Sequence, residues 1–261
     1  MSSSLDDWKH WRDERVVAAR APHGPLALTG THWLADLRGG VPGVPGRWEQ
    51  QDKCVVLTAA AHDGLAVDGV ALDGSVKLCP DTAPKPSVIT HGGRKLILIL
   101  RDGEYAVRIY DPASAARSAF AGIDAHPYDE QWALPARFTA YDEDRSVGVR
   151  NADGRERPLE LAGTVAFTVP DSGEELTLQV SRAGDGSLSA VFADATSGRE
   201  SFGFRFVSLA APDRDGATVL DFNRAYLPPC AFADHFICPF PPPGNRLAVA
   251  VPAGETHVFQ H

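Results

Sequence analysis

The sequence RKLILILRDGEYAVRIYD, residues 94–111, decides the fold class of this chain. Its two runs of strand-forming residues are joined by Asp102–Gly103, a dipeptide typical of tight hairpin turns because both positions tolerate a positive φ. The first run is apolar throughout, which predicts a strand covered on both faces. The second run alternates, with Tyr105 on one side and Arg108 on the other. We therefore predict a β-hairpin within an antiparallel sheet.

Short runs of the same kind fill most of the remaining chain. KCVVLTA and SVKLC precede the hairpin, and LAGTVAFTVP, ELTLQV and ATVLDFN follow it, each bounded by Gly, Asp or Pro. Runs at this spacing are typical of all-β domains. The predicted fold is mainly β: an antiparallel β-barrel or sandwich of about a dozen short strands, with one N-terminal helix.

The N-terminal residues 1–22 carry the helix. Ser4 is placed to cap it, Asp7 stands three residues on as in a capping box, and Pro22 ends it. Residues 23–261 then form the β-rich domain, in which a subdomain boundary is open near residues 112–120.

Asp–Gly pairs recur at residues 63–64, 68–69 and 73–74. Calcium loops need ligands on alternate residues and a closing bidentate Glu, which this stretch does not offer. Successive tight turns are the preferred interpretation.

Composition and charge narrow the classes of function. Lys plus Arg number 25 against 34 Asp plus Glu, a net charge of -9, and no basic stripe carries interleaved aromatic residues, so we expect no nucleic-acid partner. No apolar run is long enough to span a bilayer and no secretory signal is visible, which predicts a cytoplasmic protein without a membrane partner. None of the four cysteines forms a C-x-x-C pair, and no nucleotide or metal motif occurs; we expect no metal and no cofactor.

Residues 221–255, DFNRAYLPPCAFADHFICPFPPPGNRLAVAVPAGE, carry the candidate chemistry. Their prolines exclude a helix or a central strand, so the stretch is predicted to be a long, stiff connection, and its phenylalanines favour burial over disorder. Asp221, Asn223 and Arg224 follow a strand; the guanidinium suits a carboxylate or phosphate ligand, while an internal ion pair between Asp221 and Arg224 is an equal alternative.

Two thiols lie in the same stretch. Cys230 and His235 suggest a nucleophile and a base, although an inert, packed Cys is the preferred interpretation; Cys230 and Cys238 could also form a redox disulfide. Further on, Arg246 precedes an apolar run and Glu255 follows it.

The pattern of this stretch closely resembles a bacterial family, domain of unknown function 1684. The resemblance rests on DFNRAY-x-PPCAF, CP-x-PPP-x-NRL and AGE, with VRIYDP, W-x-L-x-ARF and THWL upstream, and so extends over nearly the whole chain. It implies one β-rich unit, with two departures: Leu227 stands where the family more often has Asn, and no fixed His is expected at His235. The resemblance places in the shared pattern Arg108, Arg137, Asp221, Asn223, Arg224, Tyr226, Cys230, Cys238, Asn245, Arg246 and Glu255.

Three functions are compatible with these features. The first is a pocket for a small anionic molecule, with Arg108, Arg137, Arg224 and Arg246 as anchors; as an enzyme it would be a hydrolase or isomerase using Asp221 or Glu255 as general base. The second is a non-catalytic β module that recognises a protein or peptide. In the third, the C-terminal motif only closes a barrel. Oligomeric state cannot be read from the chain.

Overall fold

The computed structural model describes residues 4–170 and 172–261, and contacts divide the chain into two compact units. Unit 2 comprises Ala18–Ala119; unit 1 comprises Phe120–His261 and the N-terminal residues up to Val17. Most of the N-terminal helix α1, Leu5–Arg20, therefore groups with unit 1. The predicted capping box is confirmed, since the Asp7 amide donates to Ser4 Oγ and the Ser4 amide donates to the Asp7 carboxylate.

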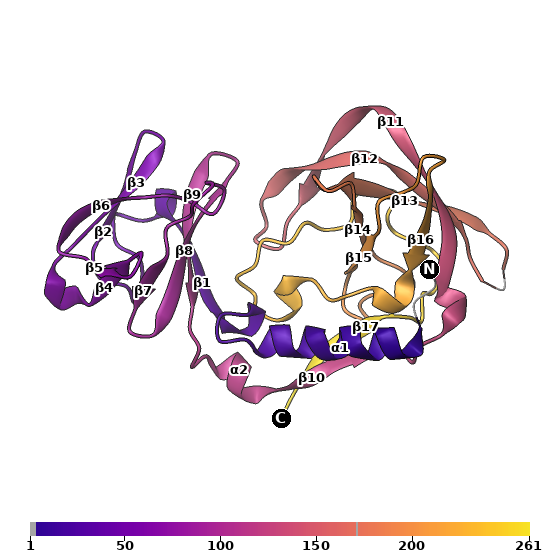
Figure 1. The fold of residues 1–261 in the computed structure, drawn as a ribbon, viewed down its shortest axis with the longest axis horizontal. Helices are drawn as coiled ribbons and strands as arrows, with labels where there is room; N and C mark the ends of the chain where they lie inside the picture. Colours follow the sequence, from indigo (N-terminus) through magenta and orange to yellow (C-terminus); the bar gives the residue numbers. More distant parts are fainter. Residues whose placement is uncertain (1–3, 171) are drawn as a thin grey trace. The chain divides into compact units, whose positions relative to one another are not determined.

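Unit 2 contains nine antiparallel strands in two sheets (Figure 1). The larger sheet has the order β1-β9-β8-β7-β4-β5 and the smaller one the order β2-β3-β6. The bounds are β1 Leu28–Trp33, β2 Arg47–Gln51, β3 Cys54–Ala59, β4 Leu65–Val67, β5 Val70–Ala71, β6 Gly74–Leu78, β7 Ile89–His91, β8 Arg94–Arg101 and β9 Glu104–Tyr110, followed by the short helix α2 Ala115–Ala119.

The predicted hairpin is confirmed as β8 and β9. Asp102 and Gly103 have φ of 51° and 82°, as a turn with two positive φ angles requires. Leu98 and Ile99, neighbours that point to opposite faces, are both buried, which explains the continuous apolar run. The second Asp–Gly pair also makes a tight turn, between β4 and β5.

Unit 1 is built on a six-stranded antiparallel sheet of order β15-β14-β13-β12-β11-β16, with a separate β10–β17 pair (Figure 1). Its edge strands β15 and β16 also contact one another, so the sheet curls into a half-barrel. The bounds are β10 Phe120–Ala125, β11 Ala133–Arg150, β12 Glu156–Thr168, β13 Glu175–Arg182, β14 Leu188–Phe192, β15 Arg205–Leu209, β16 Ala217–Asp221 and β17 Glu255–Gln260. Short 3-10 turns at Glu130–Trp132, Phe222–Arg224 and Pro229–Ala231 join these strands.

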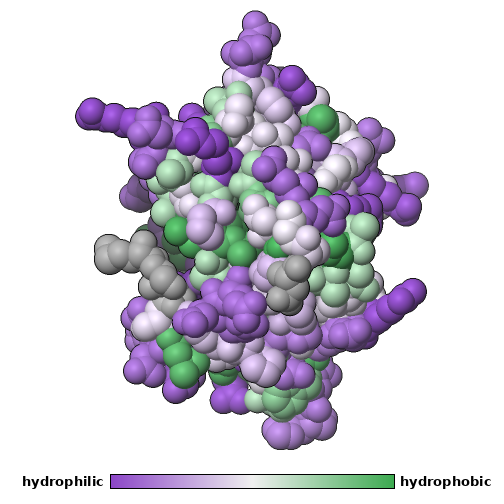
Figure 2. All heavy atoms as spheres, turned by 90° about the vertical axis from the view of Figure 1, so that its right-hand side faces the viewer, coloured by the Kyte–Doolittle hydropathy of each residue, from purple (hydrophilic) through white to green (hydrophobic). Residues whose placement is uncertain are grey.

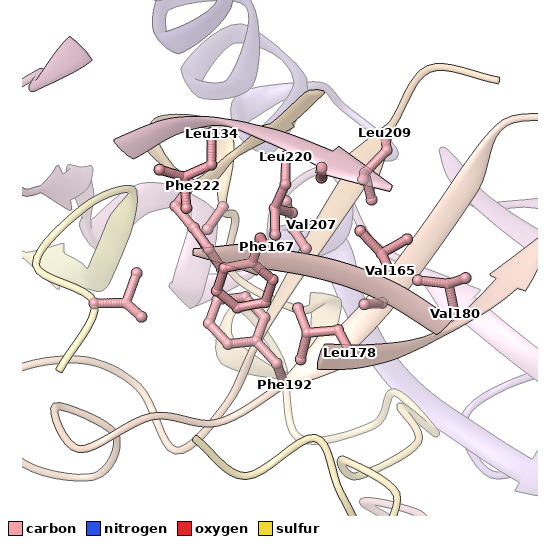
Figure 3. Packing of buried hydrophobic residues seen from close by; sticks show 14 of the residues in the cluster. Leu134, Val165, Phe167, Leu178, Val180, Phe192, Val207, Leu209, Leu220 and Phe222 are labelled. Atoms are coloured by element: carbon pink, nitrogen blue, oxygen red, sulfur yellow. The ribbon is translucent and has the colours of Figure 1, made fainter. Parts of the chain in front are cut away.

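The core of unit 1 lies on one face of this sheet (Figure 3). Phe222 sits at its centre, fully buried, with Trp132, Phe167 and Phe192 packed edge-on at ring distances of 5.9, 5.5 and 5.3 Å. The described residues hold seventeen strands, more than the dozen expected, because strands of two or three residues such as β4 and β5 are too short for alternation to reveal them.

Within residues 4–170 and 172–261, no helix has both the length and the hydrophobicity to cross a lipid bilayer.

Candidate functional site

Unit 1 contains a cavity of about 260 Å³, which we call the β13–β15 pocket. Its floor comes from β13, β14 and β15. Its walls come from β12 and from residues 221–255, which we call the C-terminal stretch. It is lined by Leu159, Leu161, Gln179, Ser181, Ser189, Ala190, Val191, Phe206, Tyr226, Pro239 and Asn245.

Strand alternation explains the floor. In β13, Leu178 and Val180 point into the core, so Gln179 and Ser181 point to the opposite face of the sheet. Phe206 likewise faces away from the core, since its neighbour Val207 belongs to it. The sequence predicts this alternation, but it does not predict that the second face is also covered.

The cover is a hairpin arm made by the outer halves of β11 and β12. These strands pair from Arg145 to Arg150 after a register shift that follows Ala140, and Leu159 and Leu161 on the arm line the pocket. The C-terminal stretch binds the tip of the arm: Asn151 bridges to Pro239, and the Phe240 amide donates to the Arg150 carbonyl.

The polar groups of the pocket are hydroxyls and an amide. Ser181 Oγ donates to the Glu160 carbonyl at 2.5 Å and Gln179 Nε2 donates to the Pro243 carbonyl at 2.5 Å. Ser189 is exposed, which leaves its hydroxyl accessible to a ligand. Tyr226 is the one lining residue with an ionisable side chain.

Of the residues predicted from the sequence, the structure brings Tyr226 and Asn245 to this pocket. Asn245 is fully buried and holds strands together: its Nδ2 donates to the Gln179 and Val191 carbonyls, and its Oδ1 accepts from the Gln179 amide. Tyr226 packs edge-on against Phe206 at 5.8 Å, with its hydroxyl 3.4 Å from Ser208 Oγ. Tyr226 therefore offers a ring face to a ligand, whereas the Asn245 amide already bonds to the backbone of neighbouring strands.

Asp221 and Asn223 form a buried local network rather than a ligand site. Asp221 Oδ1 accepts from the amide and the side chain of Asn223, whose side chain also exchanges two hydrogen bonds with the backbone of Asp129. Arg224 Nε lies 3.6 Å from Asp221 Oδ2, so the ion-pair alternative describes this pair. Arg224 does not line the pocket.

Glu255 is a structural anchor. Its side chain is 0% exposed and accepts from Arg15 Nε at 2.8 Å, from Arg15 Nη2 at 2.9 Å and from the Leu227 amide at 2.7 Å. Arg15 also stacks over the Tyr226 ring at 5.0 Å. The fork of Arg15 ties α1 to the C-terminal strand, and it leaves the carboxylate no room to act as a base.

The other predicted anchors lie elsewhere. Arg137 is exposed on β11 and donates to the Asp215 carbonyl, and Arg246 is exposed. Arg108 belongs to unit 2, where burial lowers its pKa and a hydrogen bond to Tyr110 opposes that effect. None of the four arginines lines the β13–β15 pocket, so the expected set of anion anchors does not assemble there.

The Cys230 thiol is half-buried beside Cys238, and His235 is exposed. A hydrogen bond with the Cys238 thiol, together with burial, raises the pKa of Cys230. A raised pKa disfavours the thiolate, which agrees with the interpretation of Cys230 as a packed thiol and opposes a role as an activated nucleophile.

Sequence reasoning missed a buried cation, Arg205. It is 0% exposed, pairs with Asp194 at 2.5 Å, and donates to the Ala253 and Val251 carbonyls. Burial lowers its pKa, and Asp194 opposes that effect. The sequence does indicate this buried cation, since a lone Arg interrupts the apolar run FGFRFV. It forms a structural ion pair and not a ligand site.

Among the described ranges, no group of three or more His, Cys, Asp or Glu side chains is arranged to hold a metal ion.

Comparison with known proteins identifies the family. The model described as "Protein of unknown function (DUF1684)" matches residues 118–256, more than half of the 261-residue chain and most of unit 1. The solution NMR structure of the uncharacterized protein from gene locus rrnAC0354 of Haloarcula marismortui matches with 34% identity and a TM-score of 0.43, over 52% of this chain and 77% of that one. No curated protein matches. On the match over residues 118–256, the chain belongs to the DUF1684 family.

Proposed function

We propose that unit 1 binds a small, uncharged and largely apolar molecule in the β13–β15 pocket. The observation that carries this proposal is the lining: aliphatic and aromatic side chains surround a few hydroxyl and amide groups, and no carboxylate, guanidinium, imidazole or thiol from the described residues is among them. Pockets of this kind bind through apolar contact and orient the ligand by a few hydrogen bonds.

The ligand is smaller than a typical cofactor. The cavity volume of about 260 Å³ falls just below the range of roughly 300–1,000 Å³ that is common for small-molecule sites. Ser189 and Tyr226 would supply hydrogen bonds to a hydroxyl or carbonyl of the ligand, while Leu161, Val191 and Phe206 would contact its apolar part.

Charge argues for a neutral ligand in place of the anion expected from the sequence. The Arg15 guanidinium stacks over the ring of the lining residue Tyr226, and Glu255 neutralises it through two hydrogen bonds. Among the residues that the structure describes, the lining itself contains no Lys or Arg to pair with a ligand anion.

Binding without catalysis is the better-supported form of this proposal. A hydrolase or isomerase needs a general base within hydrogen-bond reach of its substrate. Asp221 and Glu255 do not line the pocket: both Glu255 oxygens accept hydrogen bonds, Asp221 Oδ1 accepts from Asn223, and Asp221 Oδ2 is buried 3.6 Å from Arg224 Nε.

Recognition of a protein or peptide has less support. Among the described residues of unit 1, the exposed large hydrophobic ones are Leu5, Val17 and Phe259, on two separate elements. Figure 2 shows hydrophobic side chains in small groups between polar ones. Exposed apolar patches that mark interfaces are larger and continuous. A cytoplasmic location stays a prediction, supported by four cysteines of which none forms a disulfide.

The test is a ligand titration followed by amide chemical shifts of β13 and β14. Indole and cyclohexanol serve as neutral probes, and benzoate and inorganic phosphate as anionic ones. Ser189→Trp, on β14, fills the pocket. Thr177→Trp, on β13, is the control: it places the same side chain on the same face of the sheet but outside the pocket lining.

We expect neutral probes to shift Gln179, Ser181 and Ser189 in the parent chain and in Thr177→Trp, but not in Ser189→Trp. Stronger binding of benzoate or phosphate that disappears in Arg224→Ala would overturn the proposal in favour of an anion site.

A further inference from the structure

Cys230 and Cys238 are the two thiols of the C-terminal stretch, and they are in contact. The backbone amide of Cys230 lies 3.4 Å from Cys238 Sγ, and the two thiols share a hydrogen bond. Neither forms a disulfide in the structure. A disulfide between them would require the loss of two protons and two electrons, and a sulfur–sulfur distance of about 2.05 Å.

The pair differs in access to solvent. Cys230 is half-buried, at the 3-10 turn Pro229–Ala231, whereas Cys238 is 6% exposed. A reagent in solution therefore reaches Cys230 first, and Cys238 is placed behind it, as a resolving thiol is in dithiol chemistry.

The position of the pair connects it to the pocket wall. Pro239, next to Cys238, lines the pocket, and the Cys238 carbonyl accepts from the Ala152 amide at the tip of the hairpin arm. Tyr226, four residues before Cys230, lines the pocket from the other end of the same segment.

We propose that Cys230 and Cys238 are a redox-active dithiol that small-molecule disulfides oxidise reversibly. The Cys230 thiolate attacks one sulfur of the reagent, forming a mixed disulfide and releasing one small thiol. The Cys238 thiolate then attacks the Cys230 sulfur and releases the second small thiol. The protein loses two electrons and two protons, and the reagent is reduced to two thiols.

Oxidation is faster at higher pH. The hydrogen bond with Cys238 and burial raise the pKa of Cys230, so the thiol is not activated and its attack on the reagent is slow near neutral pH. Because the thiolate fraction grows about tenfold per pH unit below the pKa, the first step accelerates by roughly the same factor between about pH 7 and about pH 8.

The bond would fix the spacing between two parts of the pocket wall. Its effect on ligand affinity rests on the function proposed above, but the oxidation itself does not, and the experiment below contains no ligand.

The experiment uses the full chain carrying Cys54→Ser and Cys79→Ser. Cys54 precedes Val55 and Cys79 follows Leu78, the pair at one end of the β3–β6 ladder, and removing both cysteines leaves only the proposed pair. The probe is oxidised glutathione under native conditions, followed by intact mass, by alkylation of free thiols and by amide exchange.

Three results are expected. The parent of this series loses two hydrogens in mass and both reactive thiols, and dithiothreitol restores them. Cys238→Ser stops at a stable glutathione adduct on Cys230, because the resolving thiol is gone. Cys230→Ser stays unmodified, because Cys238 is shielded.

Amide exchange shows whether the disulfide stabilises the backbone next to Cys238 or changes the protein elsewhere. The Ala152 amide, bonded to the Cys238 carbonyl, and the Phe240 amide, bonded to the Arg150 carbonyl, should exchange more slowly in the oxidised chain. Accumulation of an unresolved adduct in the parent would overturn the proposal. So would two thiols that stay free in the native chain while a urea-unfolded sample becomes oxidised.

Discussion

The ion pair between Arg15 and the buried Glu255 should stabilise unit 1. Glu255 is 0% exposed and receives three hydrogen bonds, two of them from the guanidinium of a side chain that is 25% exposed. The two residues are 240 positions apart, so the pair fixes the N-terminal helix on the last strand of the chain.

Removing each partner has a different cost. Arg15→Met leaves a carboxylate buried with the Leu227 amide as its remaining donor, and breaking a buried pair in this way costs about 3–5 kcal/mol. Glu255→Gln leaves a guanidinium that is partly exposed and can be hydrated, so the loss is that of charge-assisted hydrogen bonds, about 1.5–3 kcal/mol. The double variant Arg15→Met/Glu255→Gln should cost less than the sum of the two, with a coupling free energy of about 2 kcal/mol.

Urea unfolding of the four proteins measures these differences, with amide exchange of residues 120–261 assigning the transition to unit 1. Arg15→Lys is the matched control, because it keeps the charge but loses the fork, and it should fall between the parent and Arg15→Met. Additive costs within about 0.5 kcal/mol, or a larger cost for Glu255→Gln than for Arg15→Met, would refute the reasoning.

Three further changes test the fold. Burial alone would raise the pKa of Asp81, but the hydrogen bonds from Arg101 and a backbone amide lower it. Because the pKa is lowered on folding, ionised Asp81 stabilises the folded state above about pH 4, and this contribution is lost as the pH falls. Asp81→Asn should therefore flatten that part of the profile of urea midpoint against pH, measured between about pH 3 and about pH 7. Phe222→Ala empties the centre of the unit 1 core and should lower the free energy of unfolding in urea by about 3–5 kcal/mol. Gly254 has φ of +81° and a Cβ there would meet a backbone oxygen at 2.6 Å, whereas Gly198 has φ of +77° and open space around it. In thermal unfolding, Gly254→Ala should therefore lower the melting temperature clearly more than Gly198→Ala does. Equal losses would contradict the role of the close contact.

Local sequence patterns predicted the elements that depend on neighbouring residues. Asp102–Gly103 set the hairpin because its φ requirement is local, and Ser4 with Asp7 set the helix start for the same reason. The register shift after Ala140 is different. It divides one long hairpin into a part inside the six-stranded sheet and an arm, and no residue in the run predicts which face the arm will cover.

The candidate site was harder to predict, because side chains with obvious chemistry are used inside the fold. Asp221, Asn223, Asn245 and Glu255 stood out as polar residues in an apolar, proline-rich stretch, and all four are buried and hydrogen-bonded within the protein. A stretch that lacks regular strands cannot satisfy its neighbours' backbone groups by ladder pairing, so side chains must do so. Polar residues in such a stretch are therefore explained by structure before function.

The same reasoning points to where function remains possible. Once the buried polar groups are assigned to the backbone they satisfy, the surface left for a ligand is the outer face of β13–β15, with Ser189 exposed and Tyr226 presenting its ring. This face has ordinary residue types that no motif search would select, and it became a pocket only because the hairpin arm and the proline-rich stretch cover it. The stiff, proline-rich stretch thus serves as a wall of the pocket and not as a carrier of catalytic groups. Its prolines fix the position of that wall, and the proposed disulfide would fix it further.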